Sequence, residues 1–193
     1  MTPPSLILVS SSPRRRELLT ALGISLRVRA AEVDEEPREG EDAEQMVLRL
    51  AIAKATAIVA MPDEIVLGAD TAVVLDGKIF GKPRDEADAL RMLGELSGRA
   101  HRVLTGVAVC RRGRLSSALS NTEVQFREID PDEARCYWHS GEPRDKAGAY
   151  AIQGRGGMFV KAIMGSYSGV VGLPVFETAR LLRDAGLELL PAR

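Results

Sequence analysis

The stretch Ile65-Val66-Leu67-Gly68-Ala69-Asp70-Thr71-Ala72-Val73-Val74-Leu75 decides how the rest of the chain is read. Its two apolar runs predict short buried strands at 64–67 and 72–75. Between them, an aspartate at the end of a buried strand is costly to desolvate unless a cation compensates it. Strand ends are also where α/β proteins place their chemistry. Asp70 is therefore a candidate site residue, although an aspartate that closes a hairpin turn gives the same local pattern.

The flanking sequence alternates between strand and helix patterns. Apolar runs predict strands at 6–9, 26–29, 102–111 and 115–127, and Asp76-Gly77 predicts a two-residue hairpin turn. Amphipathic spacing and capping residues predict helices at 13–22, 42–61 (ended by Pro62), 85–96, 131–139 and 174–185, and the glycine-rich segment 148–159 leads to a short strand. Because the strict βαβ order is missing, we expect an α/β fold with a mixed central sheet flanked by helices.

Composition sets the class of protein. The 193 residues are 45% hydrophobic and 27% charged, which is typical of a soluble protein, and we expect a single domain over 1–193. A net charge of −1 argues against a nucleic-acid partner. The two cysteines, Cys110 and Cys136, have no metal-site spacing, and no apolar run is long enough for a membrane span or signal peptide. These features predict a reduced, cytoplasmic chain.

The segment Ser10-x-Ser12-Pro13-Arg14-Arg15 predicts an anion site at a helix start. Ser12 is a good N-cap and Pro13 occupies the first helical position. Arg14 and Arg15 lie in the first turn, where the helix dipole disfavours positive charge, and a bound phosphate would offset that cost. A solvated basic helix start remains the alternative.

Other candidates are scattered along the chain. The acidic run around Glu35, together with Asp70, offers the carboxylates that Mg²⁺ prefers, although a solvated acidic loop reads the same way. Lys54 and Lys82 are point charges suited to a polyphosphate, but each alone is typical of a surface lysine. Gln153, in the glycine-rich segment, offers a donor and an acceptor to a base edge. Neither a Rossmann nor a P-loop motif is present.

Taken together, these motifs resemble the Maf family of nucleoside triphosphate pyrophosphatases, over about residues 6–182. The resemblance rests on Ser10-x-Ser12-Pro13-Arg14-Arg15-x-Glu17-Leu18-Leu19, Val33-Asp34-Glu35, Arg49-Leu50-Ala51-x-x-Lys54-Ala55, Gly68-Ala69-Asp70-Thr71, Gly81-Lys82-Pro83, Leu96-Ser97-Gly98, Thr105-Gly106, Gly141-Glu142-Pro143-x-Asp145-Lys146-Ala147-Gly148-Ala149-Tyr150, Ile152-Gln153-Gly154 and Val171-Gly172-Leu173-Pro174.

The resemblance implies a function. Members of the family hydrolyse the bond between the α- and β-phosphates, with Mg²⁺ or Mn²⁺, in a two-lobed fold similar to inosine triphosphatases, with a nucleotide cleft and usually as homodimers. By position, Asp70 matches the family's general base, and its other polar cleft residues are matched by Ser10, Arg15, Glu35, Lys54 and Lys82. Arg14, Thr71 and Gln153 match the branch that prefers dTTP and UTP, not the branch that prefers 7-methyl-GTP.

The sequence therefore predicts a dTTP/UTP pyrophosphatase that cleans the nucleotide pool. Asp70 would orient or deprotonate the attacking water while Glu35 helps to hold the metal, but Asp70 as chiefly a metal ligand fits the sequence equally well. Two other functions remain open. One is a nucleotide-binding regulator of septum formation, and the other is an enzyme that clears non-canonical purine triphosphates, for which Gln153 with Thr71 offers a poor base edge.

Overall fold

A computed structural model describes residues 4–190, and its chain falls into two compact units. Unit 1 contains the chain up to Asp70, Thr105–Ser120, and the chain from Gly172 onward. Unit 2 contains Thr71–Leu104 and Asn121–Val171. The chain first passes from unit 1 to unit 2 between Asp70 and Thr71, inside the stretch 65–75.

The strands form a seven-stranded mixed sheet. They are β1 (Ser5–Val9), β2 (Leu26–Arg29), β3 (Glu64–Leu75), β4 (Lys78–Phe80), β5 (Ala100–Arg111), β6 (Arg114–Phe126) and β7 (Val160–Met164). The order is β2-β1-β3-β5-β6-β7, with β4 paired to β3. β1 runs parallel to both β2 and β3, whereas β4 and β7 pair antiparallel to β3 and β6. The expectation of a mixed α/β fold is confirmed.

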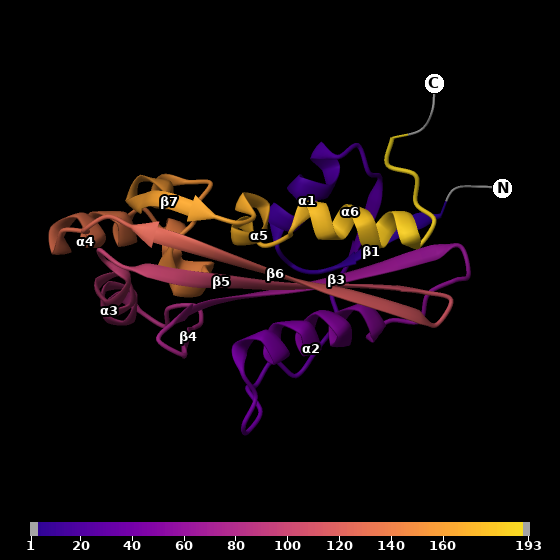
Figure 1. Ribbon diagram of the computed structural model, residues 1–193, viewed down its shortest axis with the longest axis horizontal. Helices are drawn as coiled ribbons and strands as arrows, with labels where there is room; N and C mark the ends of the chain where they lie inside the picture. Colours follow the sequence, from indigo (N-terminus) through magenta and orange to yellow (C-terminus); the bar gives the residue numbers. More distant parts are fainter. Residues whose placement is uncertain (1–3, 191–193) are drawn as a thin grey trace. The chain divides into compact units, whose positions relative to one another are not determined.

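In unit 1, helices cover both faces of the sheet (Figure 1). Helices α1 (Pro13–Ala21) and α6 (Val175–Asp184) lie on one side of β1 and β3, and α2 (Ala43–Thr56) lies on the other. Leu19 of α1 and Leu182 of α6 are fully buried in one core with Leu8 and Leu67 of the sheet. On the other face, Ala51 and Ala55 of α2 pack on Ala108, so small side chains let this helix lie close to the strands.

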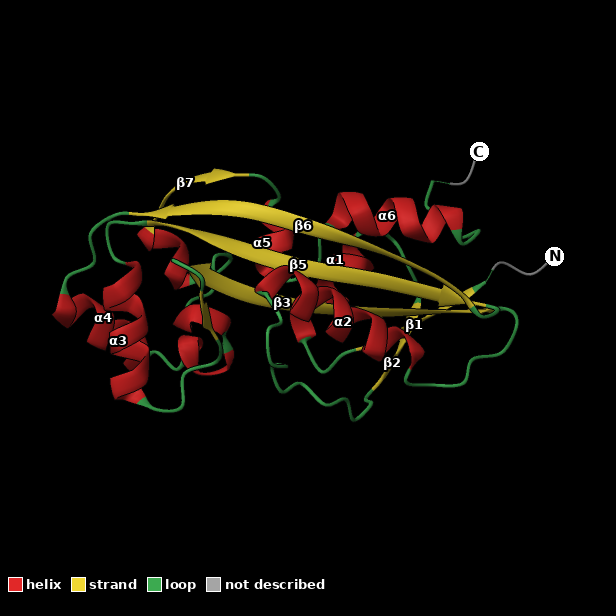
Figure 2. Ribbon diagram, turned by 60° about the horizontal axis from the view of Figure 1, so that its bottom comes forward, coloured by secondary structure: helices red, strands yellow, loops and turns green. Residues whose placement is uncertain are grey.

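Unit 2 has its own core. Helices α3 (Glu86–Leu96) and α4 (Pro131–His139) pack against each other (Figure 2). Phe80, Phe126 and Phe159 are buried between them and the strands, with Tyr137 and Tyr150. The unit also contains α5 (Tyr167–Val171) and three short 3₁₀ turns, η1 (Glu142–Asp145), η2 (Ala147–Ala149) and η3 (Arg155–Phe159). These turns lie in and around the glycine-rich segment.

Two expectations about the extent of the elements are wrong. The helix predicted over 42–61 ends at Thr56, because the chain beyond it is mostly exposed; Val59 is 96% exposed. The strands predicted at 64–67 and 72–75 are one strand, β3, so Asp70 lies inside a strand rather than at its end. Ser12 is the N-cap of α1, but its side chain makes no capping bond. The short helix α5 has no counterpart among the predicted elements.

Among residues 4–190, no helix is long and apolar enough to cross a bilayer.

Candidate functional site

The close approach of α2 to β3 builds the centre of the candidate site in unit 1. A Cβ placed on Gly68 would lie 2.4 Å from the Ala51 carbonyl oxygen and 2.6 Å from the Ala55 amide nitrogen. Glycine therefore lets the helix backbone rest directly on the strand. Side chains alternate along a strand, so Asp70 shares the face of Gly68 and points toward the same helix. Thr71 follows on the opposite face.

Lys54 of α2 joins the two predicted carboxylates. Its Nζ donates to Asp70 Oδ1 at 2.7 Å and lies 2.7 Å from Glu35 Oε1. The side chains of Lys54 and Asp70 are 12% and 15% exposed, whereas that of Glu35 is 58% exposed. One ammonium thus partly neutralises two carboxylates that are far apart in sequence, and both carboxylates lie within reach of a single cation.

Arg15 and Ser10 are fixed beside each other at the start of α1. Arg15 Nε donates to the Gly172 carbonyl at 2.7 Å, and its Nη1 donates to Ser10 Oγ at 3.2 Å. Ser10 Oγ also accepts from the Ser12 amide at 3.1 Å. Burial lowers the pKa of Arg15, the charge of Asp70 opposes that effect, and the neighbouring charge of Arg14 adds to it. The guanidinium is thus held in one orientation, partly desolvated, at a helix N-terminus.

Arg49 is a residue whose part in the site the sequence reasoning missed. Its Nε and Nη2 bind both carboxylate oxygens of Glu41, at 2.5 and 2.7 Å. The same guanidinium donates to the carbonyls of Asp34 (3.4 Å) and Glu36 (3.1 Å), the two neighbours of Glu35. Arg49 therefore ties the loop that carries Glu35 to α2. Its signal was the motif Arg49-x-x-x-x-Lys54, which places both side chains on one helix.

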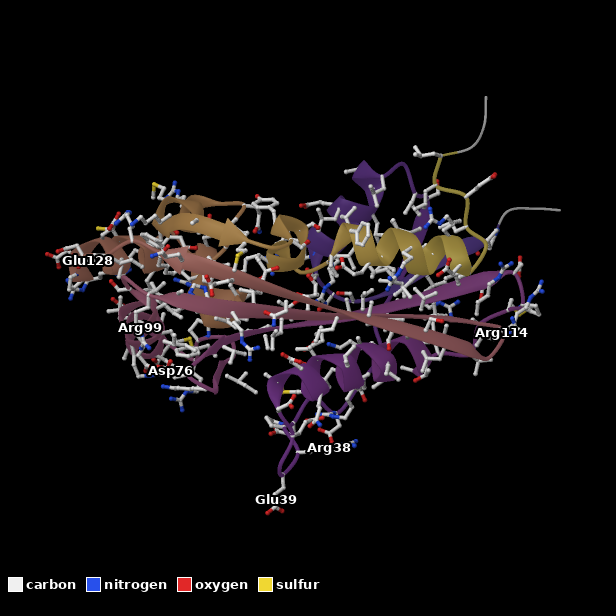
Figure 3. All side chains as sticks on the ribbon, in the orientation of Figure 1. Arg38, Glu39, Asp76, Arg99, Arg114 and Glu128 are labelled. Carbon is white, nitrogen blue, oxygen red and sulfur yellow. The ribbon has the colours of Figure 1, made fainter. Side chains whose placement is uncertain are left out.

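The loop that carries Glu35 extends well beyond its hydrogen bonds with Arg49. Figure 3 shows Arg38 and Glu39 at its tip, on the side of α2 away from the strands. Glu32, Glu36 and Glu39 are exposed, so most of the acidic run is the solvated loop that was the alternative interpretation. Glu35 is the exception, because Lys54 contacts it.

The remaining predicted residues belong to unit 2. The Gly148 amide donates to the Gly81 carbonyl at 3.1 Å, so the Gly81-Lys82-Pro83 segment runs beside the glycine-rich segment that carries Gln153. Lys82 and Gln153 are exposed and Thr71 is partly buried. The structure thus brings together Ser10, Arg14, Arg15, Glu35, Lys54 and Asp70 in unit 1, and it places Thr71, Lys82 and Gln153 in unit 2.

The donor set of unit 1 determines which cation would fit. Within residues 4–190, no group of three or more His, Cys, Asp or Glu side chains is arranged to hold a metal. Glu35 and Asp70 form a pair of hard oxygen donors, and Mg²⁺ usually takes one or two carboxylates and completes its shell with water and substrate phosphates. The residues present therefore fit a Mg²⁺- or Mn²⁺-type ion whose remaining ligands would come from outside the protein.

Comparisons with known proteins give a consistent picture. The family model described as "Maf-like protein" matches residues 5–185. A dTTP/UTP pyrophosphatase from Methylococcus capsulatus is 55% identical over 94% of this chain and 91% of its own length. One from Anaeromyxobacter dehalogenans is 55% identical over 96% of both chains, and one from Aromatoleum aromaticum is 49% identical over 94% of this chain and 96% of its own.

Among solved structures, a nucleoside-triphosphatase / dITP/XTP pyrophosphatase from Mycobacterium abscessus has a TM-score of 0.39. It is 14% identical and covers 71% of this chain and 95% of its own. That similarity is too low to support an inference about function.

Proposed function

Because the chain belongs to the Maf family, we propose that it is a nucleoside triphosphate pyrophosphatase acting on dTTP and UTP. It would hydrolyse the α–β phosphoanhydride to give a nucleoside monophosphate and pyrophosphate, and so remove unwanted pyrimidine nucleotides from the pool. The observation that carries the proposal is the Lys54 ammonium shared between Asp70 and Glu35, with Arg15 interacting electrostatically with both carboxylates. The names of the similar proteins support the choice of substrate.

One set of the predicted site residues would bind the triphosphate, and another set would bind the base. A triphosphate brings several negative charges, which Arg15, Lys54 and Lys82 would neutralise while Ser10 holds Arg15 in place. Arg14, Thr71 and Gln153 would select the base, since a glutamine amide meets the mixed donor and acceptor edge of thymine or uracil.

Asp70 would supply the hydrolytic step. Its carboxylate accepts a proton from, or orients, the water that attacks phosphorus, and the bond that breaks joins that phosphorus to the bridging oxygen. The proton passes to the carboxylate and the leaving pyrophosphate takes the electron pair. Glu35 and Asp70 would hold a Mg²⁺ or Mn²⁺ ion, which when bound neutralises phosphate charge. We further propose a cytoplasmic homodimer.

The test is pyrophosphate release from dTTP, UTP, CTP, 7-methyl-GTP and ITP with Mg²⁺ or Mn²⁺. We expect dTTP and UTP to be preferred, and Asp70→Asn to lower kcat by at least about 100-fold because a general base contributes that much. Nucleotide binding, measured by calorimetry, should change little. The exposed Asp63 makes Asp63→Asn a matched control in unit 1.

Two results would contradict the proposal. A near-normal rate in Asp70→Asn would show that Asp70 is not the catalytic carboxylate. No release from any nucleotide, with binding retained, would instead favour the nucleotide-binding regulator of cell division.

A further inference from the structure

The segment that carries Gln153 is fastened on both sides by two side chains of unit 2. Tyr137 comes from α4, and Glu142 begins the 3₁₀ turn η1 that follows it. Neither residue was among the predicted site residues. Tyr137 is 4% exposed and Glu142 is partly buried. A buried hydroxyl and a partly buried carboxylate next to an exposed loop require hydrogen-bond partners, and these partners are backbone groups of the loop.

The hydrogen bonds are specific. Glu142 Oε2 accepts from the Arg155 amide at 3.0 Å and Oε1 accepts from the Gly156 amide at 3.0 Å. Tyr137 Oη donates to Glu142 Oε1 at 2.7 Å and accepts from the Ala151 amide at 3.0 Å. The two side chains therefore bind the backbone before Gln153 and after it, as one connected network.

Glycines make room for this network. A Cβ on Gly154 would lie 2.3 Å from Glu142 Oε2, and one on Gly156 would lie 2.6 Å from Tyr137 Oη. Contacts this short are not compatible with any side chain, so both positions need glycine while Tyr137 and Glu142 are in place. The glycines at these positions therefore serve close packing rather than flexibility.

The ionisation states suit the network. Burial acts to raise the pKa of Glu142, but hydrogen bonds from Gly156, Arg155 and Tyr137 outweigh it, so the pKa is lowered. Burial raises the pKa of Tyr137 far above its usual value, and the bond to Glu142 adds to the effect. At neutral pH the carboxylate is ionised and accepts only, while the hydroxyl keeps its proton, as the observed bonds require.

We propose that Tyr137 and Glu142 are positioning residues that set base selectivity through Gln153. They fix the backbone on either side of Gln153, so that its side chain starts from one place and less ordering entropy is lost when its amide meets the base edge. The role rests on the proposed function, in which Gln153 reads the base. It is separate from hydrolysis, because neither residue belongs to the group around Asp70.

The test measures kcat and KM for UTP and ITP in the full-length protein. Glu142→Gln should raise KM for UTP and lower the UTP/ITP selectivity, each by roughly 10- to 100-fold, since small misplacements of a positioning group have effects of that size. Tyr137→Phe keeps the ring in the core and removes only the hydroxyl, so it gives a second reading if Glu142→Gln folds poorly. Gln153→Ala should lose the same selectivity.

A double-mutant cycle separates positioning from general damage. If the residues act through Gln153, adding Glu142→Gln to Gln153→Ala should change selectivity by less than about 2-fold, as expected for groups that act as a unit. Matched controls are Glu128→Gln, an exposed carboxylate labelled in Figure 3, and Tyr167→Phe, a tyrosine 50% exposed. Both should keep wild-type selectivity.

Unchanged selectivity in Glu142→Gln and Tyr137→Phe, or a multiplicative loss in the double variant, would overturn the role. If the wild type releases no pyrophosphate, the proposed activity is wrong. The UTP/ITP selectivity is then measured as the ratio of the dissociation constants of the two nucleotides in the wild type and the variants. A changed binding ratio would still support the positioning role, and an unchanged ratio would reject it.

Discussion

Lys54 places one ammonium beside the two carboxylates that would hold the proposed metal. Because Asp70 Oδ1 and Glu35 Oε1 each lie 2.7 Å from Nζ, the ammonium and a divalent cation compete for the same charge. We predict that Lys54→Met binds Mn²⁺ roughly 3- to 10-fold more tightly in the absence of nucleotide, and has a higher KM for dTTP. Electron paramagnetic resonance of free Mn²⁺ measures the first effect. Lys161→Met, at an exposed lysine, is the control, and equal Mn²⁺ affinity in both variants would exclude competition.

His101 is a buried histidine that the proposed reaction does not use. It is 2% exposed, its Nε2 lies 2.9 Å from Tyr150 Oη, and burial lowers its pKa to about 4. The unfolded chain gains a proton near pH 6.5 whereas the folded protein does not. The free energy of unfolding should therefore fall as pH drops from 6.5 to about 4, by up to about 3 kcal/mol, with no contribution above 6.5.

Urea unfolding at pH 7, 5.5 and 4 measures this loss. His101→Gln should show a shallower decline than the wild type. His139, whose side chain is 61% exposed, supplies the control, since His139→Gln should follow the wild-type profile. Parallel profiles for all three proteins would assign the acid sensitivity to carboxylates instead.

At the level of elements, the seating of α2 on the strands depends on two glycines. Besides Gly68 on β3, Gly106 on β5 would place a Cβ 2.3 Å from the Val47 carbonyl oxygen. We predict that Gly68→Ala lowers the free energy of unfolding by about 1–3 kcal/mol or more, as overpacking does, and lowers activity by moving Lys54 away from Asp70.

Thermal and urea unfolding check the effect of Gly68→Ala. In Gly94→Ala of α3 the new methyl group meets no atom within 4 Å, so that variant should be neutral or more stable by up to about 1 kcal/mol. Equal stability of the two variants would mean that α2 shifts without cost.

Capping and turn residues predicted the helix starts and turns that depend on local sequence. The features that depend on tertiary packing were predicted wrongly. Asp130 and Pro131 gave the start of α4, and Asp76-Gly77 gave the hairpin, where both residues have positive φ as that turn requires. The end of α2 was predicted too late, because periodicity cannot show where the core stops. β3 was predicted as two strands, because Gly68 and Asp70 resemble strand breakers until α2 is placed over them.

The candidate site follows the same rule. The sequence predicted Asp70, Lys54 and Glu35 singly, because their side chains suit phosphate or metal chemistry. The contact of the Lys54 ammonium with both carboxylates depends on a helix packed on a strand, which the sequence does not show. The sequence did not predict the roles of Tyr137 and Glu142, because nothing in it shows that their side chains form hydrogen bonds with each other and with the glycine-rich segment. Their partners are backbone amides, which every sequence contains.

At the level of the whole molecule, β3, β5 and β6 each contribute residues to both units. If either unit unfolds, these three strands are disrupted in the other unit as well. We therefore predict a single cooperative unfolding transition. The one tryptophan, Trp138, packs on the core of unit 2, so its fluorescence reports on that unit while far-UV circular dichroism reports on all helices. Coincident urea midpoints are expected, and separated midpoints would show that the units unfold independently.

The burial of Leu181 and Leu182 of α6 in the core of unit 1 has a consequence for biosynthesis. The ribosome makes β1, α1 and most of β3 first, yet the core that they share with α6 stays open until α6 has left the exit tunnel. Unit 2 is encoded entirely before that point. The segment that is translated first is thus among the last to have its core closed. Nascent chains halted before α6 should therefore be the ones that chaperones retain.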